Sequence, residues 1–406
     1  MQSFKYQARD PATGKKITSE VQADSIQSAS RLIKQQGLTV IDVTPSSESS
    51  NGILNRITNR ITTKDKVLFS RQLSTLINAG LPLVQSLRNV SSQTQNKALQ
   101  AIIGKIIVDI EAGSAFSVAL SKYPKVFNEV FVSLVAAGEV SGTLDKALER
   151  IANQQEKDAE IISKIRGAMV YPAIVIVVMI AVVGFMIVTV MPQVEKIYAD
   201  LPGANLPLIT KILLAVSNFT IKYWYIVLIV LALSIFFTTR WARTMGGKEA
   251  IDKAKMKSPV FGPLFMKVYM ARITRTGTTL VASGVPLIQM LEIVARAVDN
   301  VHIERSVRKA IDKVKGGKSL SDALRGDPNF LSLVPDMIHI GEESGSLEDM
   351  LAKTADYYEK EVDNQIKTIS TIIEPILMVL LGIVAFTIVA AVLLPVYGLV
   401  NQTNIV

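Results

Sequence analysis

Three stretches of the chain are strongly apolar and carry no charged residue. They are residues 167–194, residues 223–239, and the run from Pro375 to the end of the chain. A helix rises 1.5 Å per residue and the bilayer core is about 30 Å thick, so the first and third runs are long enough to span it. The second run is short, but it opens on Tyr223 and Trp224, which are typical of the membrane interface. We predict three transmembrane helices, at residues 169–191, 223–239 and 374–397.

Outside these runs, apolar residues recur mostly at helical spacing. Residues 66–79 and residues 96–112 each place an apolar set near one face, and each segment is followed by a glycine suited to ending a helix, Gly80 and Gly113. Thr143 is placed to cap a long amphipathic helix that runs toward the first span. The pattern predicts helical bundles of about six helices each.

The N-terminal segment has a different pattern. Residues 4–8 and 15–23 flank a turn, residues 25–36 favour a helix, and residues 38–43 alternate as a strand. The sequence therefore predicts a small α+β segment, followed by a linker rich in serine.

An internal repeat organises the rest of the chain. The matched segments are Ala79–Leu83 with Ser283–Leu287, Gly138–Gly142 with Gly341–Gly345, and Tyr171-Pro172 with Glu374-Pro375. Their order is the same in both copies, and their separation is 204 residues at first and 203 after a one-residue deletion. Each copy is thus a helical domain followed by one span. The first and third spans are equivalent and must cross the membrane in the same direction. The second span, which has no equivalent, must therefore bring the chain back to the side from which it started.

These patterns predict an all-α membrane protein with two repeated cytoplasmic bundles, three transmembrane helices and the N-terminal α+β segment. The predicted divisions are residues 1–44 (α+β segment), 45–64 (linker), 65–168 (bundle 1), 169–191 (first span), 192–222 (extracytoplasmic connection), 223–239 (second span), 240–373 (bundle 2), 374–397 (third span) and 398–406 (extracytoplasmic tail).

The distribution of charge predicts the orientation. The chain has 44 basic and 35 acidic side chains, a net charge of +9. Such an excess fits nucleic-acid binding, membrane-surface binding or the basic bias of cytoplasmic loops. Arg240–Lys257, directly after the second span, holds six basic and two acidic residues. We therefore predict a multi-pass protein of the cytoplasmic membrane, with the N-terminus in the cytoplasm, the C-terminus outside and no direct contact with nucleic acid.

The sequence gives little support for catalysis. It has no cysteine, which excludes thiolate metal sites and cysteine nucleophiles, and it lacks the P-loop, dinucleotide and zinc-protease motifs. Its two histidines, His302 and His339, have no counterparts in the first copy. We expect no enzymatic activity, no cofactor and no metal site.

Two other classes of membrane protein fit the sequence less well. A transporter is disfavoured because the spans contain no charged residue and the repeats are parallel. A membrane receptor or sensor scaffold would need an external ligand domain, for which the predicted connection and tail are too short.

The repeated Gly-Glu-x-Ser-Gly segments leave two interpretations open. In the structural one, glycine ends a helix and the carboxylate of Glu139 or Glu342 binds nearby backbone N–H groups. In the other, the carboxylate binds a divalent ion or a partner. The structural or partner candidates of the whole repeat are Gly80, Pro82, Gly138, Glu139, Gly142, Tyr171, Pro172, Gly284, Pro286, Gly341, Glu342, Gly345, Glu374 and Pro375.

The doubled motif resembles the type II secretion system F family, the inner-membrane platform proteins of type IV pili and general secretion. The resemblance covers residues 69–399 with both copies in order, and the N-terminal segment resembles an extension that many members carry. It implies helical bundles and a small homo-oligomer, most simply a homodimer. It also implies three kinds of partner: a hexameric cytoplasmic ATPase for assembly or retraction, pilins or pseudopilins, and inner-membrane alignment proteins.

Overall fold

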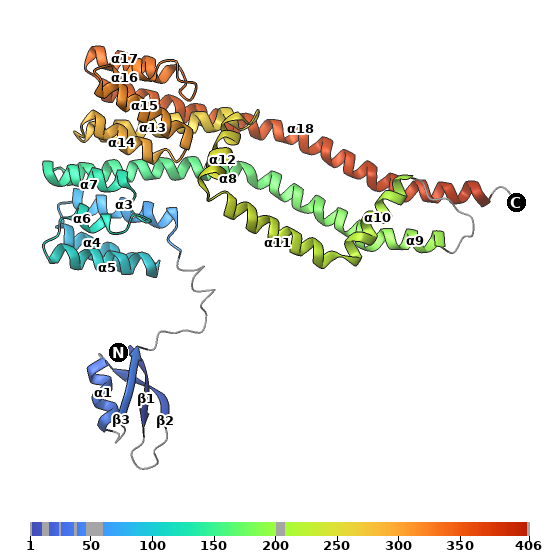
Figure 1. The fold of residues 1–406 in the computed structure, drawn as a ribbon, viewed down its shortest axis with the longest axis horizontal. Coiled ribbons are helices and arrows are strands. Elements are labelled where there is room, and N and C mark those ends of the chain that lie inside the picture. Colours follow the sequence, from blue (N-terminus) through green and yellow to red (C-terminus); the bar gives the residue numbers. More distant parts are fainter. Residues whose placement is uncertain are drawn as a thin grey trace. The chain divides into compact units, whose positions relative to one another are not determined.

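The computed structural model describes residues 2–9, 16–23, 26–35, 39–45, 60–199 and 208–403. These residues form two compact units, a small one that contains the N-terminal segment and a large helical one (Figure 1). Most of the predicted linker, part of the connection between the first two spans and the last three residues of the predicted tail lie outside the described residues.

The N-terminal segment is a three-stranded antiparallel sheet with one helix. Its elements are β1 (Gln2–Arg9), β2 (Lys16–Ala23), α1 (Ile26–Gln35) and β3 (Thr39–Pro45). Strand β1 lies in the centre and pairs with both others, so that Ala8 faces Ile17 on one side and Val40 on the other. Ala8 and Ile33 are fully buried. The strands and the helix coincide with the segments that the alternating and helical patterns indicate.

The first repeat forms a bundle of six helices, which we call bundle 1. They are α3 (Thr63–Asn78), α4 (Leu83–Gln93), α5 (Lys97–Glu111), α6 (Phe116–Ser121), α7 (Glu129–Ser141) and α8 (Leu144–Phe185). Its core includes three phenylalanine rings, Phe69, Phe127 and Phe131, whose centroids lie 5.0–6.5 Å apart. Such tilted ring pairs add to the stabilisation that apolar burial provides.

The second repeat, which we call bundle 2, has the same six helices in the same order. They are α13 (Gly262–Ala282), α14 (Leu287–Ala297), α15 (Val301–Lys315), α16 (Leu320–Leu324), α17 (Leu333–Ser344) and α18 (Leu347–Thr403). An additional helix, α12 (Met245–Lys257), precedes them. The buried carboxylate of Asp252 in α12 accepts a hydrogen bond from the Val301 N–H at the start of α15. This contact joins α12 to the repeated bundle.

Three helices in the described part of the chain are long and apolar enough to cross a membrane. They are Leu144–Lys196, Trp224–Trp241 and Leu347–Leu393. The first contains the predicted span at 169–191, and the other two overlap the predicted spans at 223–239 and 374–397. The prediction of three transmembrane helices is confirmed. The structure adds that the first and third spans are continuous with the last helix of each bundle, since α8 has 42 residues and α18 has 57. The second span, α11 (Trp224–Trp241), has no buried residue.

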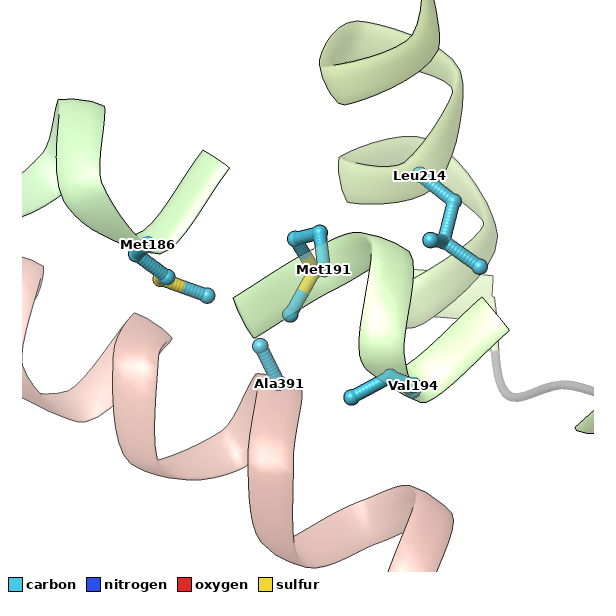
Figure 2. Packing of buried hydrophobic residues seen from close by; sticks show 5 residues of the cluster. All are labelled: Met186, Met191, Val194, Leu214 and Ala391. Carbon is cyan, nitrogen blue, oxygen red and sulfur yellow. The ribbon is translucent and has the colours of Figure 1, made fainter. Parts of the chain in front are cut away.

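The residues between the first two spans are largely helical. A π-helix (Met186–Val190) follows α8 and leads into α9 (Met191–Ala199), and α10 (Leu208–Lys222) precedes α11. Met186, Met191 and Val194 pack against Leu214 of α10 and Ala391 of α18 (Figure 2). The predicted connection is therefore more than a loop, because it packs against the third span.

A serine from α10 stabilises the π-helix. The wider turn of a π-helix displaces carbonyl groups from their ordinary partners, and the buried Ser217 hydroxyl donates a hydrogen bond to the Ile187 carbonyl oxygen at 2.5 Å. We expect Ser217→Ala to lower the free energy of unfolding by about 1 kcal/mol, the usual contribution of one such bond. Thermal unfolding of the purified full chain in detergent measures this effect.

Thr387→Ala is the matched control. The Thr387 hydroxyl binds the Ile383 carbonyl one turn earlier in α18, a local bond within one helix. The loss of this bond should leave the free energy of unfolding unchanged within about 0.5 kcal/mol. An equal change in both variants would contradict a specific role for Ser217.

Candidate functional site

The repeated Gly-Glu-x-Ser-Gly segments form the corner at which α7 meets α8 and α17 meets α18. Gly142 and Gly345 end the first helix of each pair with φ angles of 70° and 67°, a left-handed conformation that favours glycine. Thr143 occupies the predicted N-cap position of α8, but its side chain makes no capping bond. The Thr143 hydroxyl lies 2.7 Å from the Ser141 hydroxyl instead. The predicted N-cap position of Thr143 is therefore confirmed, although its hydroxyl binds Ser141 and not a backbone N–H group of α8.

The glutamate of each corner holds the start of a short neighbouring helix. The carboxylate of Glu139 accepts hydrogen bonds from the N–H groups of Phe116 and Ser117, at 2.6 and 3.0 Å, and from the Ser117 hydroxyl. Glu342 repeats this arrangement with the N–H groups of Leu320 and Ser321. Both oxygens of each carboxylate have donors, which is the geometry of the structural interpretation. It fixes α6 to α7 and α16 to α17.

The first glycine of each corner permits two helices to approach closely. A Cβ atom on Gly138 would lie 2.7 Å from the Ala147 Cβ atom, and one on Gly341 would lie 2.9 Å from the Leu347 Cα atom. Real side chains do not tolerate such distances without movement of a neighbour. The corner thus sets the packing of the long helix against the bundle.

The other predicted motif residues lie at the first turn of each bundle and at the start of the first and third spans. Gly80 and Gly284, with φ angles of 84° and 77°, end α3 and α13, and Pro82 and Pro286 stand directly before α4 and α14. Bonds such as Leu81 N–H to the Leu76 carbonyl, at 3.1 Å, close these turns in the manner of a Schellman motif.

The motif at the start of each span does not interrupt its helix. Pro172 is buried inside α8, and the exposed Tyr171 precedes it. Glu374 and Pro375 lie on the exposed surface of α18. Bundle and span are therefore joined by continuous helix in both repeats.

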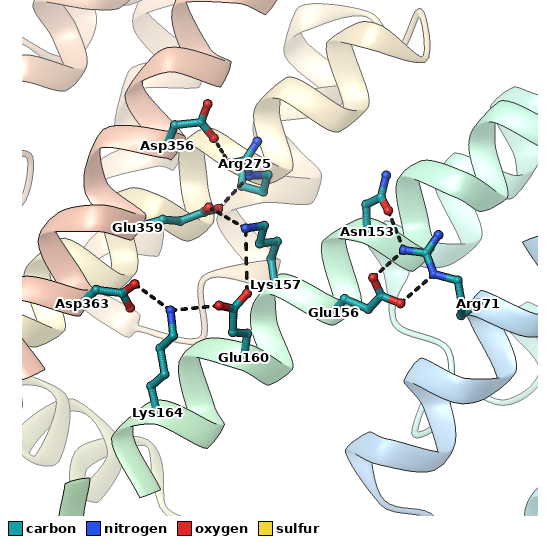
Figure 3. A network of polar contacts seen from close by, with 10 residues as sticks. All are labelled: Arg71, Asn153, Glu156, Lys157, Glu160, Lys164, Arg275, Asp356, Glu359 and Asp363. Carbon is teal, nitrogen blue, oxygen red and sulfur yellow. Dashed lines mark hydrogen bonds and ion pairs between the residues drawn. The ribbon is translucent and has the colours of Figure 1, made fainter. Parts of the chain in front are cut away.

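A network of ion pairs links the helices just before the spans (Figure 3). In bundle 1, Arg71 of α3 binds Glu156 and Asn153 of α8. In bundle 2, Arg275 of α13 binds Glu359 and Asp356 of α18. The two sets are related by the same separations of 204 and 203 residues that relate the repeats. That spacing is the signal in the sequence from which one set of ion pairs could have been found from the other.

A cavity of about 280 Å³ lies between the two bundles. It is lined by residues of both, among them Lys66, Gln154 and Asp158 of bundle 1 and Arg272 of bundle 2. Burial raises the pKa of the Asp158 carboxyl, while Arg272, a hydrogen bond with Gln154 and Arg275 oppose this and Glu359 adds to it. The raised pKa means that the folded chain takes up a proton at Asp158 more readily than the unfolded chain.

This shift predicts a pH dependence of stability. Above the ordinary aspartate pKa of about 3.9, stability falls as the pH rises toward the higher folded pKa, because the folded state then holds more protons. Asp158→Asn removes this loss, so we expect the variant to be more stable than the unchanged chain at neutral pH and equally stable at about pH 3. Thermal midpoints measured across this range test the prediction.

Glu160→Gln serves as the control of opposite sign. The hydrogen bond from Lys164 is the largest cause that lowers the pKa of the Glu160 carboxyl. The Glu160 variant should therefore be less stable at neutral pH. This deficit should shrink below the ordinary glutamate value of about 4.3 and vanish as the pH falls through the lower pKa of the folded chain. A parallel response of both variants would contradict the assignment at Asp158.

The described residues contain no cluster of three or more histidine or acidic side chains placed to hold a metal ion. The corner glutamates and the ion-pair network have protein groups as partners. They connect helices, and they connect each bundle to the helix that enters the apolar region.

Comparison with known proteins relates the chain to one family. The model of the type II secretion system (T2SS) protein F family matches residues 69–192 and 273–395, and the model of the protein F N-terminal domain matches residues 1–44. The two matches in the helical region correspond to the two repeats.

Individual relatives match over nearly the whole chain. The type IV pilus assembly protein PilC of Thermus thermophilus is 37% identical over 414 residues, which cover 100% of both chains. TapC of Aeromonas hydrophila, also a type IV pilus assembly protein, is 36% identical over 95% of this chain and 93% of its own. The type II secretion system protein F of Pseudomonas aeruginosa is 33% identical over 99% of each chain.

Proposed function

This chain belongs to the type II secretion system protein F family, and we propose that it is the inner-membrane platform of a type IV pilus or of a type II secretion-like system. It is a multi-pass protein of the inner membrane. The observation that carries the proposal is the continuity of α8 and α18, each of which runs from a helical bundle into an apolar span.

The proposed partners follow from this role. A cytoplasmic assembly or retraction ATPase supplies the work, pilins or pseudopilins are the subunits that are moved, and inner-membrane alignment proteins hold the platform in place. The chain is itself proposed to be a homodimer that does not hydrolyse nucleotide and does not bind nucleic acid. The sequence lacks a P-loop, which is consistent with work supplied by a partner enzyme.

The proposed orientation places both bundles on the cytoplasmic side. The basic Arg240–Lys257 stretch overlaps the end of α11 and includes α12, where the positive-inside rule assigns a cytoplasmic position. The N-terminus is then cytoplasmic and the C-terminus extracytoplasmic. Both bundles would face the ATPase, and motion of either bundle would move its span through one helix.

Deletion and complementation in the source cell test the proposed function. Deletion of the gene should abolish filament assembly or secretion, and the unchanged chain should restore it. Intact assembly and secretion after deletion would refute the proposal. Hydrolysis of ATP by the purified chain alone would refute the assignment of the work to a partner. A receptor or transporter would instead lose signalling or solute uptake while filaments persisted.

A further inference from the structure

The two bundles of one chain contact each other through different faces. Along α8, bundle 1 contributes a basic face, and bundle 2 contributes an acidic face on α13 and α18. A separate ion pair of the opposite sense joins Arg296 of α14 to Glu129 of α7. The basic face consists of Arg150, Gln154, Lys157 and Lys164, and the acidic face consists of Thr279, Ser283, Glu359 and Asp363.

Hydrogen bonds and ion pairs hold the two faces together. The Arg150 guanidinium donates to the Ala282 carbonyl at 2.6 Å and to the Ser283 hydroxyl at 3.0 Å, so it binds the end of α13. The buried Gln154 side chain accepts a bond from the Thr279 hydroxyl at 3.4 Å. These contacts place α8 of bundle 1 along α13 of bundle 2.

Two lysines complete the contact between α8 and α18 (Figure 3). Lys164 lies 2.6 Å from an oxygen of Asp363, and Lys157 lies 3.9 Å from an oxygen of Glu359. Glu359 is already bound by Arg275 of its own bundle. The acidic face therefore accepts a lysine from a neighbouring bundle in addition to its internal arginine.

The repeat shows that this interface is head-to-tail. The equivalents of the basic face in bundle 2 are Lys353, Tyr357, Lys360 and Lys367, and those of the acidic face in bundle 1 are Thr75, Ala79, Glu156 and Glu160. A symmetric interface would also bring these two sets together. Among the described residues they form no hydrogen bond or ion pair with each other within the chain. Glu160 and Lys360 lie beside the contact between α8 and α18, where Lys164 binds Glu160. The remaining side chains, among them Thr75, Lys353, Tyr357 and Lys367, are exposed, so most of one acidic face and of one basic face stays open on each molecule.

The open faces keep the chemistry of the closed ones. All three basic positions of the basic face are lysines in bundle 2, and both acidic positions of the acidic face are glutamates in bundle 1. Glu156 is bound by Arg71, as Glu359 is bound by Arg275. Tyr357 is 49% exposed, whereas its equivalent Gln154 is 7% exposed. Leu68, the equivalent of Arg272 beside the cavity, is also 49% exposed.

We propose that the open basic face of bundle 2 binds the open acidic face of bundle 1 in a second copy of this chain. A head-to-tail contact closes into a ring when the rotation between units permits it. Two chains provide four bundles, and each basic face then meets an acidic face. The equivalent spans point the same way through the membrane, so a two-fold axis along the membrane normal suits this ring.

This inference rests on the proposed function in one respect, the homodimer, and it specifies the surfaces through which the two copies bind. The chain contains no cysteine, which allows engineered cysteines to be placed without background. Thr75→Cys and Tyr357→Cys, carried by two differently tagged chains in the same membrane, should give a disulfide-linked dimer on mild oxidation. The matched control carries Gln154→Cys and Thr279→Cys in one chain, where the equivalent disulfide should form within that chain.

A second measurement tests the charges of the open face. Changing Lys353, Lys360 and Lys367 to glutamate should raise the dissociation constant of the purified dimer in detergent at least tenfold. The same change at Lys105, Lys309 and Lys318, which are exposed elsewhere on the two bundles, should leave it within about twofold.

The outcomes separate the interface from the platform role. A control disulfide without any disulfide between the tagged chains would overturn the proposed contact, as would a dimer unaffected by the three glutamates. Neither assay requires a filament. If the interchain disulfide forms while gene deletion leaves assembly intact, the interface stands and the platform function fails.

Discussion

Replacing Glu359 by alanine is expected to destabilise the protein by about 2 kcal/mol, and the same replacement at the equivalent Glu156 by less than about 1 kcal/mol. Arg275 and Glu359 are 20% and 14% exposed, whereas Arg71 and Glu156 are 37% and 41% exposed. Removing a carboxylate leaves its arginine without that partner, and water solvates the exposed arginine more readily than the buried one. Thermal unfolding of the full chain in detergent compares the two variants.

The contacts of Glu359 enlarge the expected difference. Its carboxylate accepts from Arg275 at 2.8 Å and also attracts Lys157 of bundle 1, so the Glu359 variant loses a contact within bundle 2 and one between bundles. A variant with Lys157→Ala alone serves as the control and should cost less than about 1 kcal/mol, because that pair is long and exposed on the lysine side. Equal losses at Glu156 and Glu359 would contradict the burial argument.

The sequence was sufficient to predict the spans and the repeated bundles. Both depend on local properties: an uncharged run from Gly167 onward has no stable place in water, and helical periodicity marks one face of each amphipathic helix. Gly142 and Gly345 could be placed at helix ends for the same reason, since a left-handed residue after a helix favours glycine.

The contacts between helices could not be predicted in the same way. The bond between Lys164 and Asp363 joins residues 199 positions apart, and no local pattern records which charges face each other. The same holds for Ser217 and Ile187, where a π-helix changes the carbonyl that needs a donor. Helix α12 precedes the matched segments of the repeat, so the repeat gave no indication of its contact with α15.

Thr143 is the N-cap residue of α8, as predicted, but its hydroxyl makes no capping bond, for a physical reason. The corner residues bind one another, and the hydroxyl pair of Ser141 and Thr143 recurs as Ser344 and Ser346, at 2.6 Å. The position at the start of α8 was correct, but the hydroxyl serves the corner and not the helix end. The corner glutamate, by contrast, has the backbone N–H partners of the structural interpretation.

Alanine at Gly138 or at Gly341 is expected to lower the free energy of unfolding by about 1–3 kcal/mol, and valine by more. The new Cβ atom at Gly138 would meet the Ala147 Cβ atom at 2.7 Å and the Leu144 Cα atom at 3.1 Å. Neither atom is the end of a flexible side chain, so α7 and α8 must separate. Thermal unfolding of the full chain in detergent measures the loss.

The control for these glycine variants is Gly104→Ala in α5. A Cβ atom there has no neighbour within 4 Å, and alanine is a better helix former than glycine, so this variant should gain about 0.5–1 kcal/mol. A loss at Gly104 comparable to that at Gly138 would mean that the substitutions report something other than helix spacing. A gain at all three positions would show that the corner can open without cost. The expected changes in the free energy of unfolding have opposite signs because the glycines differ in their surroundings. Only the corner glycines lie where the long helix, which continues into the membrane, packs against its bundle.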